Sequence, residues 1–110
     1  MWGAVYTGGM DKDEIKKKLL EAVKSDPHFA DIRFVAIFGS HVRGQAEQGS
    51  DVDVLIEFEP EAEIGYFALS EIKENFERFV EGTVDLLTPA ALSEYFREDV
   101  LEQAECVYEK

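Results

Sequence analysis

The sequence predicts one mixed α/β domain in which helices pack against a single sheet. The first observation is that short apolar stretches, typical of buried strands, alternate with segments whose apolar residues recur at helical spacing. The second is that no linker or internal repeat interrupts this alternation. The third is that a chain of 110 residues, 45% of them hydrophobic, fits one domain with its own core and argues against disorder.

The N-terminal part of the chain predicts a flexible arm followed by a helix. Residues 1–10 are rich in glycine and weakly periodic, so we expect an arm there and a single domain over residues 11–110. Asp11 is positioned as an N-cap with Glu14 at the capping-box spacing, and the helix should end near Ser25, before a proline. The expected buried face of this helix consists of Ile15, Leu19, Ala22 and Val23.

The middle of the chain predicts two buried strands and a second helix. Residues 32–38 (IRFVAIF) and 51–58 (DVDVLIEF) are apolar runs typical of strands, and a polar connector joins them. A helix is expected to begin at Gly65, and Gly82 is placed as the residue that ends it in the left-handed conformation. Its apolar residues recur at helical spacing, namely Leu69, Ile72, Phe76, Phe79 and Val80.

The C-terminal part predicts two further strands separated by helices. Residues 83–87 (TVDLL) are typical of a short third strand. Thr88-Pro89 is a typical N-cap followed by proline at the first helical position, so a helix is expected through about Phe96. Another helical stretch is expected at 97–104, before a last strand at 106–108.

The charge of the chain is unevenly distributed. The net charge is −13, yet residues 1–50 contain seven acidic and seven basic residues, so the whole acidic excess lies in residues 51–110. Such an acidic balance argues against a surface that binds a nucleic-acid backbone, because the phosphates would be repelled. Most of these acidic residues are interpreted as solvated surface, and a minority as metal ligands or as a face for a basic partner.

The sequence also bears on the cellular compartment. No apolar run approaches the roughly 18 residues of a membrane span, and no secretory leader is visible. The single Cys106 cannot form an internal disulfide, and no cluster of Cys and His is typical of a zinc site. We therefore expect a cytoplasmic protein without a membrane partner.

Asp51 and Asp53 form the first candidate site. Side chains alternate across a strand, so these two carboxylates should point to the same side, roughly 6–7 Å apart. Two such carboxylates are costly without a cation, and their hard oxygen atoms suit Mg²⁺ or Mn²⁺. The same D-x-D spacing at Asp11 and Asp13, with nothing typical of phosphate binding beside it, shows that the motif alone is weak.

A candidate phosphate site strengthens the interpretation of the two aspartates. Gly39-Ser40 follows a buried strand, and backbone N–H groups at such a turn can bind an anion. Gly39 would allow close approach of a ligand, and Ser40 adds a hydroxyl donor. Arg43 could reach the same anion, although a surface cation is the alternative. Together, the phosphate site and the carboxylate pair predict a site for a nucleotide and a metal.

Asp85 is the third candidate carboxylate. It lies in the apolar segment TVDLL, where an acidic residue is seldom buried without a partner. It either points to the exposed side or, if the third strand lies next to the second, joins Asp51 and Asp53 as a further ligand. In that position it could also accept the proton of an attacking hydroxyl.

Gly39-Ser40, ten intervening residues and Asp51-Val52-Asp53 together resemble the GS-x10-DxD signature of the DNA polymerase β-like nucleotidyltransferase superfamily. The chain resembles its smallest members, the minimal nucleotidyltransferases, which include the MntA-type antitoxins. The string GSHVRGQAEQGSDVDVLIEF carries the resemblance, and TVDLL and ECVYEK extend it over residues 32–110. His41 and Val42 stand where relatives often carry other residues.

The resemblance implies a nucleotidyltransferase palm, a mixed sheet with helices packed against it. It further implies that Asp51 and Asp53 hold Mg²⁺ on the triphosphate of ATP, with Gly39, Ser40 and Arg43 binding the nucleotide. Asp85 would bind the metal nearer the acceptor. The implied reaction is attack of a hydroxyl on the α-phosphorus of ATP with release of pyrophosphate.

The resemblance also implies a protein partner. The palm accounts for nearly every residue, so the acceptor is expected on another protein, in the family a HEPN-domain ribonuclease toxin that receives AMP on a tyrosine. The chain would then be the antitoxin of a toxin–antitoxin pair, in a hetero-oligomer with the toxin. Two alternatives remain open: an antitoxin that masks the toxin by stoichiometric binding, and an enzyme that modifies a small-molecule hydroxyl.

Overall fold

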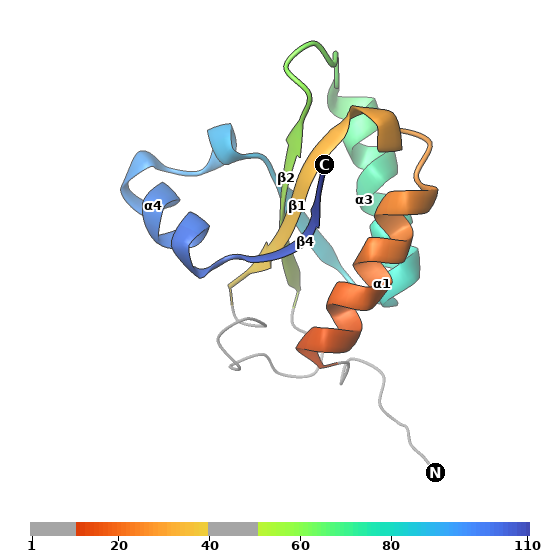
Figure 1. Cartoon of the computed structure of the whole chain (residues 1–110), viewed down its shortest axis with the longest axis horizontal. Helices are drawn as coiled ribbons and strands as arrows, with labels where there is room; N and C mark the ends of the chain where they lie inside the picture. The colour runs from red at the N-terminus through yellow and green to blue at the C-terminus, as the bar shows by residue number, and fades with distance from the viewer. Residues whose placement is uncertain (1–10, 40–50) are drawn as a thin grey trace.

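The computed structural model describes residues 11–39 and 51–110, which form a four-stranded mixed sheet with helices on both faces (Figure 1). The expected arm at residues 1–10, and Ser40 and Arg43 of the candidate site, lie outside the described residues. The strands are β1 (Ile32–Phe38), β2 (Val52–Phe58), β3 (Val84–Leu87) and β4 (Glu105–Glu109), in the spatial order β3-β2-β1-β4. β1 is antiparallel to both β2 and β4, whereas β2 and β3 are parallel. The predicted mixed sheet is therefore confirmed.

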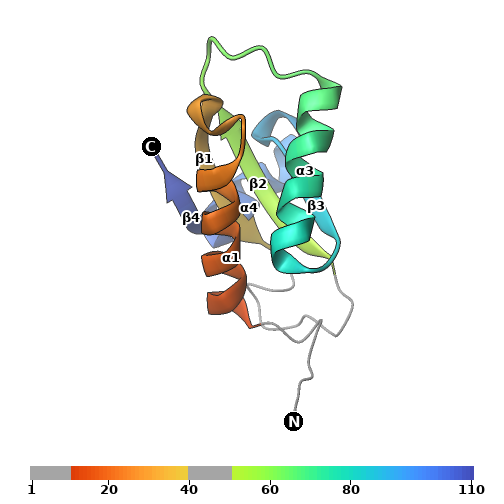
Figure 2. The same cartoon turned by 90° about the vertical axis from the view of Figure 1, so that its right-hand side faces the viewer.

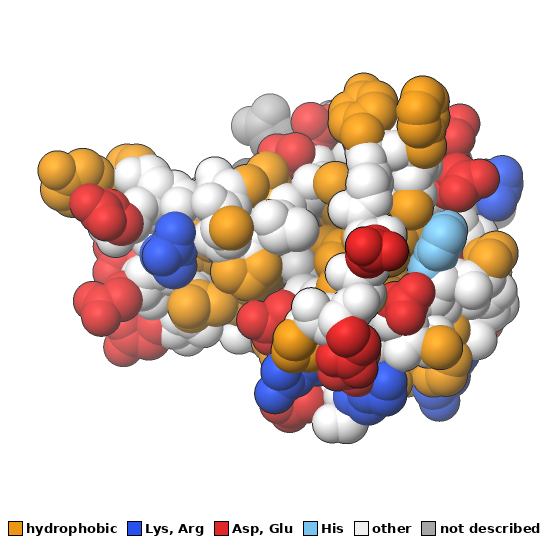
Figure 3. Space-filling model, turned by 90° about the horizontal axis from the view of Figure 1, so that it is seen from above, with side chains coloured by type: hydrophobic (Ala, Val, Ile, Leu, Met, Phe, Trp, Pro, Cys, Tyr) orange, Lys and Arg blue, Asp and Glu red, His pale blue; other side chains and the backbone are white. Residues whose placement is uncertain are grey.

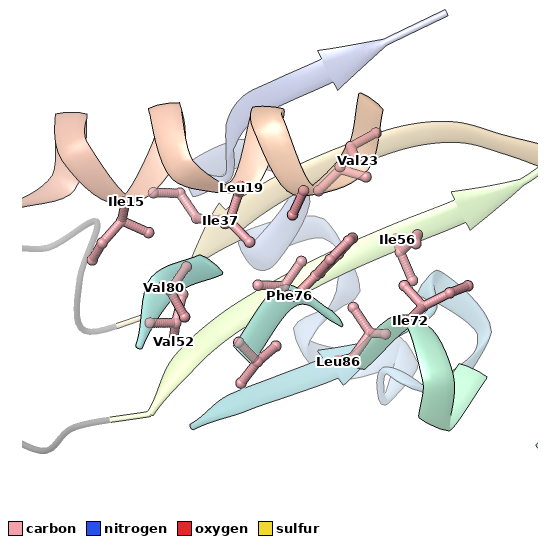
Figure 4. Close-up of a cluster of buried hydrophobic side chains, with 14 of the residues drawn as sticks. Ile15, Leu19, Val23, Ile37, Val52, Ile56, Ile72, Phe76, Val80 and Leu86 are labelled. Carbon is pink, nitrogen blue, oxygen red and sulfur yellow. The ribbon is translucent and has the colours of Figure 1, made fainter. Parts of the chain in front are cut away.

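Two helices, α1 (Lys12–Ser25) and α3 (Tyr66–Val80), cover one face of the sheet (Figure 2). The expected N-cap of α1 is confirmed, because an Asp11 carboxylate oxygen accepts a hydrogen bond from the Glu14 N–H at 2.8 Å. The core lies between these helices and the sheet, and Figure 4 shows side chains from both helices meeting those of the strands. Its fully buried members include Ile15, Leu19, Val23, Val35, Ile37, Val54, Ile56, Ile72, Phe76 and Val84.

The short connection between α1 and β1 is tied to α3 by a buried carboxylate. Asp26, which is only 5% exposed, follows the last residue of α1. Its carboxylate accepts hydrogen bonds from the His28 N–H at 2.8 Å and from Asn75 Nδ2 of α3 at 3.0 Å. A buried carboxylate needs such donors, and here they fix the turn before a 3₁₀ turn at Phe29–Asp31.

The end of α3 differs from the prediction in one position. The residue in the left-handed conformation is Glu81, with φ of 55°, rather than Gly82. The Gly82 N–H bonds to the Glu77 carbonyl at 3.3 Å, so the closing hydrogen bond of the helix is still made. The prediction was wrong because glycine is the residue that most readily adopts the left-handed conformation, so Gly82 is favoured over its neighbour. In the structure the left-handed residue comes one position earlier.

Replacing Glu81 with glycine is expected to stabilise the domain by about 0.5–1 kcal/mol, because a residue with a Cβ is strained at this φ. Urea denaturation of the wild type and Glu81→Gly would measure the difference. Glu74→Gly, at an exposed position inside α3, is the matched control and should destabilise by about 1 kcal/mol. Equal destabilisation by both substitutions would contradict this account of Glu81.

The segment after β3 also corrects the prediction. The expected helix from Thr88-Pro89 to Phe96 is instead a 3₁₀ turn, η2 (Pro89–Ala91), followed by a separate helix α4 (Glu94–Gln103). Extended backbone at Leu92 separates the two, and the Ser93 hydroxyl caps α4 by accepting a hydrogen bond from the Tyr95 N–H at 3.3 Å. A second N-cap inside the segment therefore prevails over continuation from the proline.

η2 and α4 lie on the side of the sheet opposite α1 and α3 (Figures 1 and 2). The Arg97 guanidinium holds α4 against η2 by donating to the carbonyl oxygens of Pro89 and Leu92, both at 3.1 Å. Within residues 11–39 and 51–110, no helix combines the length and the apolar character needed to cross a membrane.

Candidate functional site

The pairing of β2 with β3 brings two of the three predicted carboxylates side by side. Asp53 and Asp85 are Cα partners in the parallel register, so the condition that the third strand lies next to the second is met. Val52 and Val84, one residue before each, are buried in the core beneath α1 and α3. Because side chains alternate along a strand, Asp53 and Asp85 belong to the opposite face of the sheet. Asp85 is exposed there and Asp53 is half-buried.

Asp51 lies immediately before β2 and is exposed. It is two residues from Asp53, the spacing at which two side chains share one side of an extended chain. The sheet thus brings Asp53 and Asp85 together in register, with Asp51 at the point where β2 begins. These positions are compatible with the predicted roles, which stay predictions.

Gly39 is required by the geometry around Asp53. Phe38, the last residue of β1, is paired with Asp53, so Gly39 leaves the sheet directly beside that aspartate. Its φ is +78°, in the region that favours glycine, and a Cβ placed on it would overlap the Asp53 carboxylate and lie 3.0 Å from Cγ. The sequence predicted close approach of a ligand at Gly39. The structure shows that the group closest to its missing side chain is the carboxylate of Asp53.

Glu77, at the end of α3, fixes the beginning of the strand that carries Asp85. One of its carboxylate oxygens accepts hydrogen bonds from the Val84 N–H at 2.9 Å and from Lys73 Nζ at 3.0 Å. The hydrogen bond from Val84 lowers the pKa of Glu77 below its ordinary value, with a further contribution from Lys73 and partial burial opposing both. The sequence interpretation missed Glu77, because the only local signal was a Lys–Glu pair four residues apart on a helix.

Glu77→Gln is expected to destabilise the domain by about 1 kcal/mol at pH 7, because a neutral acceptor binds the Val84 N–H and Lys73 more weakly. A lowered folded-state pKa means that this contribution is complete above the pKa of the unfolded chain. It is lost as the pH falls through the folded value, so the difference between wild type and variant should disappear in acid.

Urea denaturation at a series of pH values between neutral and about 3 would measure the effect of Glu77→Gln. The exposed Glu74, one turn before on the same helix, supplies the control Glu74→Gln, for which little change is expected. A destabilisation by Glu77→Gln that persists unchanged at the acid end would contradict the assignment.

The donor set at the site suits a hard divalent cation. Asp51, Asp53 and Asp85 offer carboxylate oxygens, which Mg²⁺ and Mn²⁺ prefer over softer ligands. In the described part of the chain, however, no three His, Cys, Asp or Glu side chains already converge into a metal centre. Mg²⁺ usually takes one or two carboxylates together with water and substrate phosphates, so the paired Asp53 and Asp85 fit a cation that arrives with a nucleotide.

Comparisons with known proteins identify the family. The family model named nucleotidyltransferase domain matches residues 16–107 of the sequence. The chain is 35% identical over 72 residues to the protein adenylyltransferase MntA of Thermococcus cleftensis, a match that covers 66% of this chain and 71% of that protein.

Solved structures show the same fold. One assigned to the minimal nucleotidyltransferases is 30% identical, with a TM-score of 0.71 over 88% of this chain and 96% of its own. A toxin–antitoxin complex with AMP-PNP contains a chain with a TM-score of 0.69 at 18% identity, covering 86% of this chain and 73% of that one. The chain therefore belongs to the nucleotidyltransferase family, as its GS-x10-DxD pattern predicts, and its mixed sheet with packed helices is the fold of these relatives.

Proposed function

We propose that this nucleotidyltransferase transfers AMP from ATP to the hydroxyl group of a tyrosine on a HEPN-domain toxin. By this modification it would act as the antitoxin. The observation that carries the proposal is the register that sets Asp53 beside Asp85, with Gly39 of the GS pair against Asp53. Sequence relatives named protein adenylyltransferases support transfer to a protein. Toxin–antitoxin complexes among the structural neighbours support a toxin as the partner.

Different residues of the chain would bind the two substrates, ATP and the acceptor hydroxyl. Asp51 and Asp53 would hold Mg²⁺ with the triphosphate, while Ser40 and Arg43, with the backbone at Gly39, would bind phosphate oxygens. When bound, Mg²⁺ would offset the charge of the triphosphate and of the displaced pyrophosphate. Glu77 would act as a positioning residue, because its bond to Val84 fixes the backbone next to Asp85.

Asp85 would act on the acceptor. The acceptor oxygen forms a bond to the α-phosphorus, the bond from that phosphorus to the bridging oxygen breaks, and pyrophosphate leaves with the electron pair. The carboxylate of Asp85 takes the proton of the hydroxyl and would also bind metal on the acceptor side. The exposure of Asp85 on the face of the sheet away from α1 and α3 supports this role, because a protein-borne hydroxyl must reach it.

Masking of the toxin by stoichiometric binding is the second candidate, and the acidic excess of residues 51–110 favours it, since a ribonuclease needs a basic surface for RNA. Modification of a small-molecule hydroxyl is the third.

A transfer assay with α-labelled ATP, Mg²⁺ and the cognate HEPN protein separates these candidates. We expect label on the HEPN protein, and none when EDTA replaces Mg²⁺. Neutralisation of the toxin without label would support masking and overturn the proposed transfer. Turnover of ATP on an aminoglycoside or another small alcohol, without the HEPN protein, would support the third candidate instead.

A further inference from the structure

The face of the sheet that carries Asp53 and Asp85 also carries two more rows of side chains. In register with one another, Phe38, Asp53 and Asp85 form the first row. Ala36 and Leu55 belong to the next row, and Phe34 and Glu57 to the one after it. Successive rows on one face are about 7 Å apart, since each strand rises about 3.3 Å per residue. A group bound over the second row is therefore within one side-chain length of the carboxylates.

A groove lies over the second and third rows. It has a volume of about 330 Å³, and it opens between the sheet and the segment of η2 and α4. Its lining residues are Phe34, Leu55, Glu57, Pro89, Leu101 and Glu109. The floor is apolar, whereas two carboxylates, those of Glu57 and Glu109, lie at the end away from Asp53.

The helix that borders this groove is unusually exposed. All ten residues of α4, which lies wholly within the described range, are at least partly accessible to solvent. Tyr95 is 85% exposed, Phe96 64% and Leu101 47%. Figure 3 shows the segment as a lobe that projects from the main body, with hydrophobic and acidic side chains on its surface. Large apolar side chains exposed on a helix are typical of a protein-binding surface, and Leu101 also lines the groove.

The charge of this surface indicates the chemistry of its partner. The acidic residues of α4 are Glu94, Glu98, Asp99 and Glu102. The one basic residue of α4 is Arg97, whose guanidinium donates hydrogen bonds to backbone carbonyls of Pro89 and Leu92. With Glu57 and Glu109 at the groove, the whole region is negative, and it therefore favours a partner segment that combines apolar with basic side chains.

We propose that the groove between α4 and the sheet binds the acceptor-bearing segment of the partner protein. An apolar side chain of that segment occupies the space between Leu55 and Leu101, basic side chains contact Glu57, Glu109 and the acids of α4, and the acceptor hydroxyl extends over the first row towards Asp85. This inference rests on the proposed function, since it assigns to the same site the place where its protein substrate docks.

A second exposed aromatic pair supplies the matched control. Tyr66 and Phe67, at the beginning of α3, are 80% and 84% exposed and lie 6.1 Å apart between ring centroids. They are far from the carboxylates. The residue of α3 that contacts β3 beside Asp85 is Glu77, which is eleven residues after Tyr66 and thus about 16 Å from it along the helix. If the partner's acceptor segment binds only in the groove beside α4, substitutions at Tyr66 or Phe67 should not change its binding.

The test compares Leu101→Lys and Phe96→Lys with Tyr66→Lys in the full chain. Titration calorimetry measures the affinity for the cognate HEPN protein. Transfer of AMP is measured with α-labelled ATP, and nucleotide affinity is measured with AMP-PNP and Mg²⁺. The α4 variants should weaken HEPN binding about tenfold or more and reduce transfer at limiting HEPN protein, with AMP-PNP affinity unchanged. Tyr66→Lys should leave all three unchanged. Unchanged far-UV circular dichroism shows that each variant is folded.

The outcomes separate this inference from the proposed function. If wild-type chain binds the HEPN protein and Leu101→Lys and Phe96→Lys do not, but no AMP is transferred, the docking site stands and the proposed transfer fails. If both variants bind and are labelled as the wild type is, the docking site is overturned while the transfer stands. Loss of binding in Tyr66→Lys alone would also overturn it. A charge reversal, Glu98→Lys with Glu102→Lys, should slow association most at low salt.

Discussion

Asp53→Asn is expected to reduce AMP transfer by about 10³-fold or more, which corresponds to roughly 4 kcal/mol of transition-state stabilisation. Asp53 is central to the candidate site because it is paired with Phe38 on one side and with Asp85 on the other, and because Gly39 lies against its carboxylate. An amide keeps the size of the side chain but removes the charge that a cation and a triphosphate need. Transfer of label from α-labelled ATP to the HEPN protein measures the effect.

The chain contains its own control for this substitution. Asp13 belongs to the other D-x-D pair, lies in the first turn of α1 and is exposed. Asp13→Asn should therefore change transfer by less than about twofold, since an exposed surface substitution rarely has a large effect. Binding of the HEPN protein should persist in Asp53→Asn, which separates catalysis from masking. Undiminished transfer by folded Asp53→Asn would refute the assignment of the site.

Gly39→Ala is expected to reduce transfer by about 100-fold and to destabilise the domain by about 2–4 kcal/mol. The left-handed φ of Gly39 strains any residue with a Cβ, and the added methyl group also occupies the position of the Asp53 carboxylate. Either the backbone at the end of β1 or the Asp53 side chain must move. Both movements displace the carboxylate from its place beside Asp85. Thermal unfolding and the transfer assay report the two effects separately.

Gly82→Ala is the matched control for Gly39→Ala. A Cβ at Gly82 meets only the Val80 carbonyl oxygen, at the ordinary contact distance of 3.9 Å. We therefore expect a change in stability of less than about 1 kcal/mol and unchanged transfer. If Gly39→Ala proved as harmless as Gly82→Ala, the close fit between Gly39 and Asp53 would have no functional importance.

Most of the fold could be predicted because local and tertiary signals agree. The apolar run at 32–38 is β1 without change, and Asp11 caps α1 as expected. The errors arise where two local signals compete. Pro89 favoured a helix, yet Ser93 starts a new one after extended backbone at Leu92. Short-range propensity cannot decide between two adjacent N-caps, because their difference in free energy is small.

The candidate site was predictable in its residue types but not in its contacts. The spacing of Gly39, Asp51 and Asp53 is visible in the sequence, whereas the pairing of Asp53 with Asp85 depends on which strands are neighbours. Glu77 escaped prediction because its partner is a backbone N–H that only the folded chain brings near. The groove beside α4 could not be predicted for the same reason, since its lining residues come from several separate segments of the chain.

The parallel pairing of β2 and β3 also determines when the site exists during folding. Asp53 and Asp85 are separated along the chain by the whole of α3, so their contact closes a long loop. Such non-local pairings form only after the entropy of loop closure has been overcome, and they slow folding. A nascent chain that has completed β1 and β2 thus lacks Asp85, one of the three candidate carboxylates. In the proposed division of roles Asp85 acts on the acceptor, so competence to transfer AMP would be acquired late, together with the docking of β3.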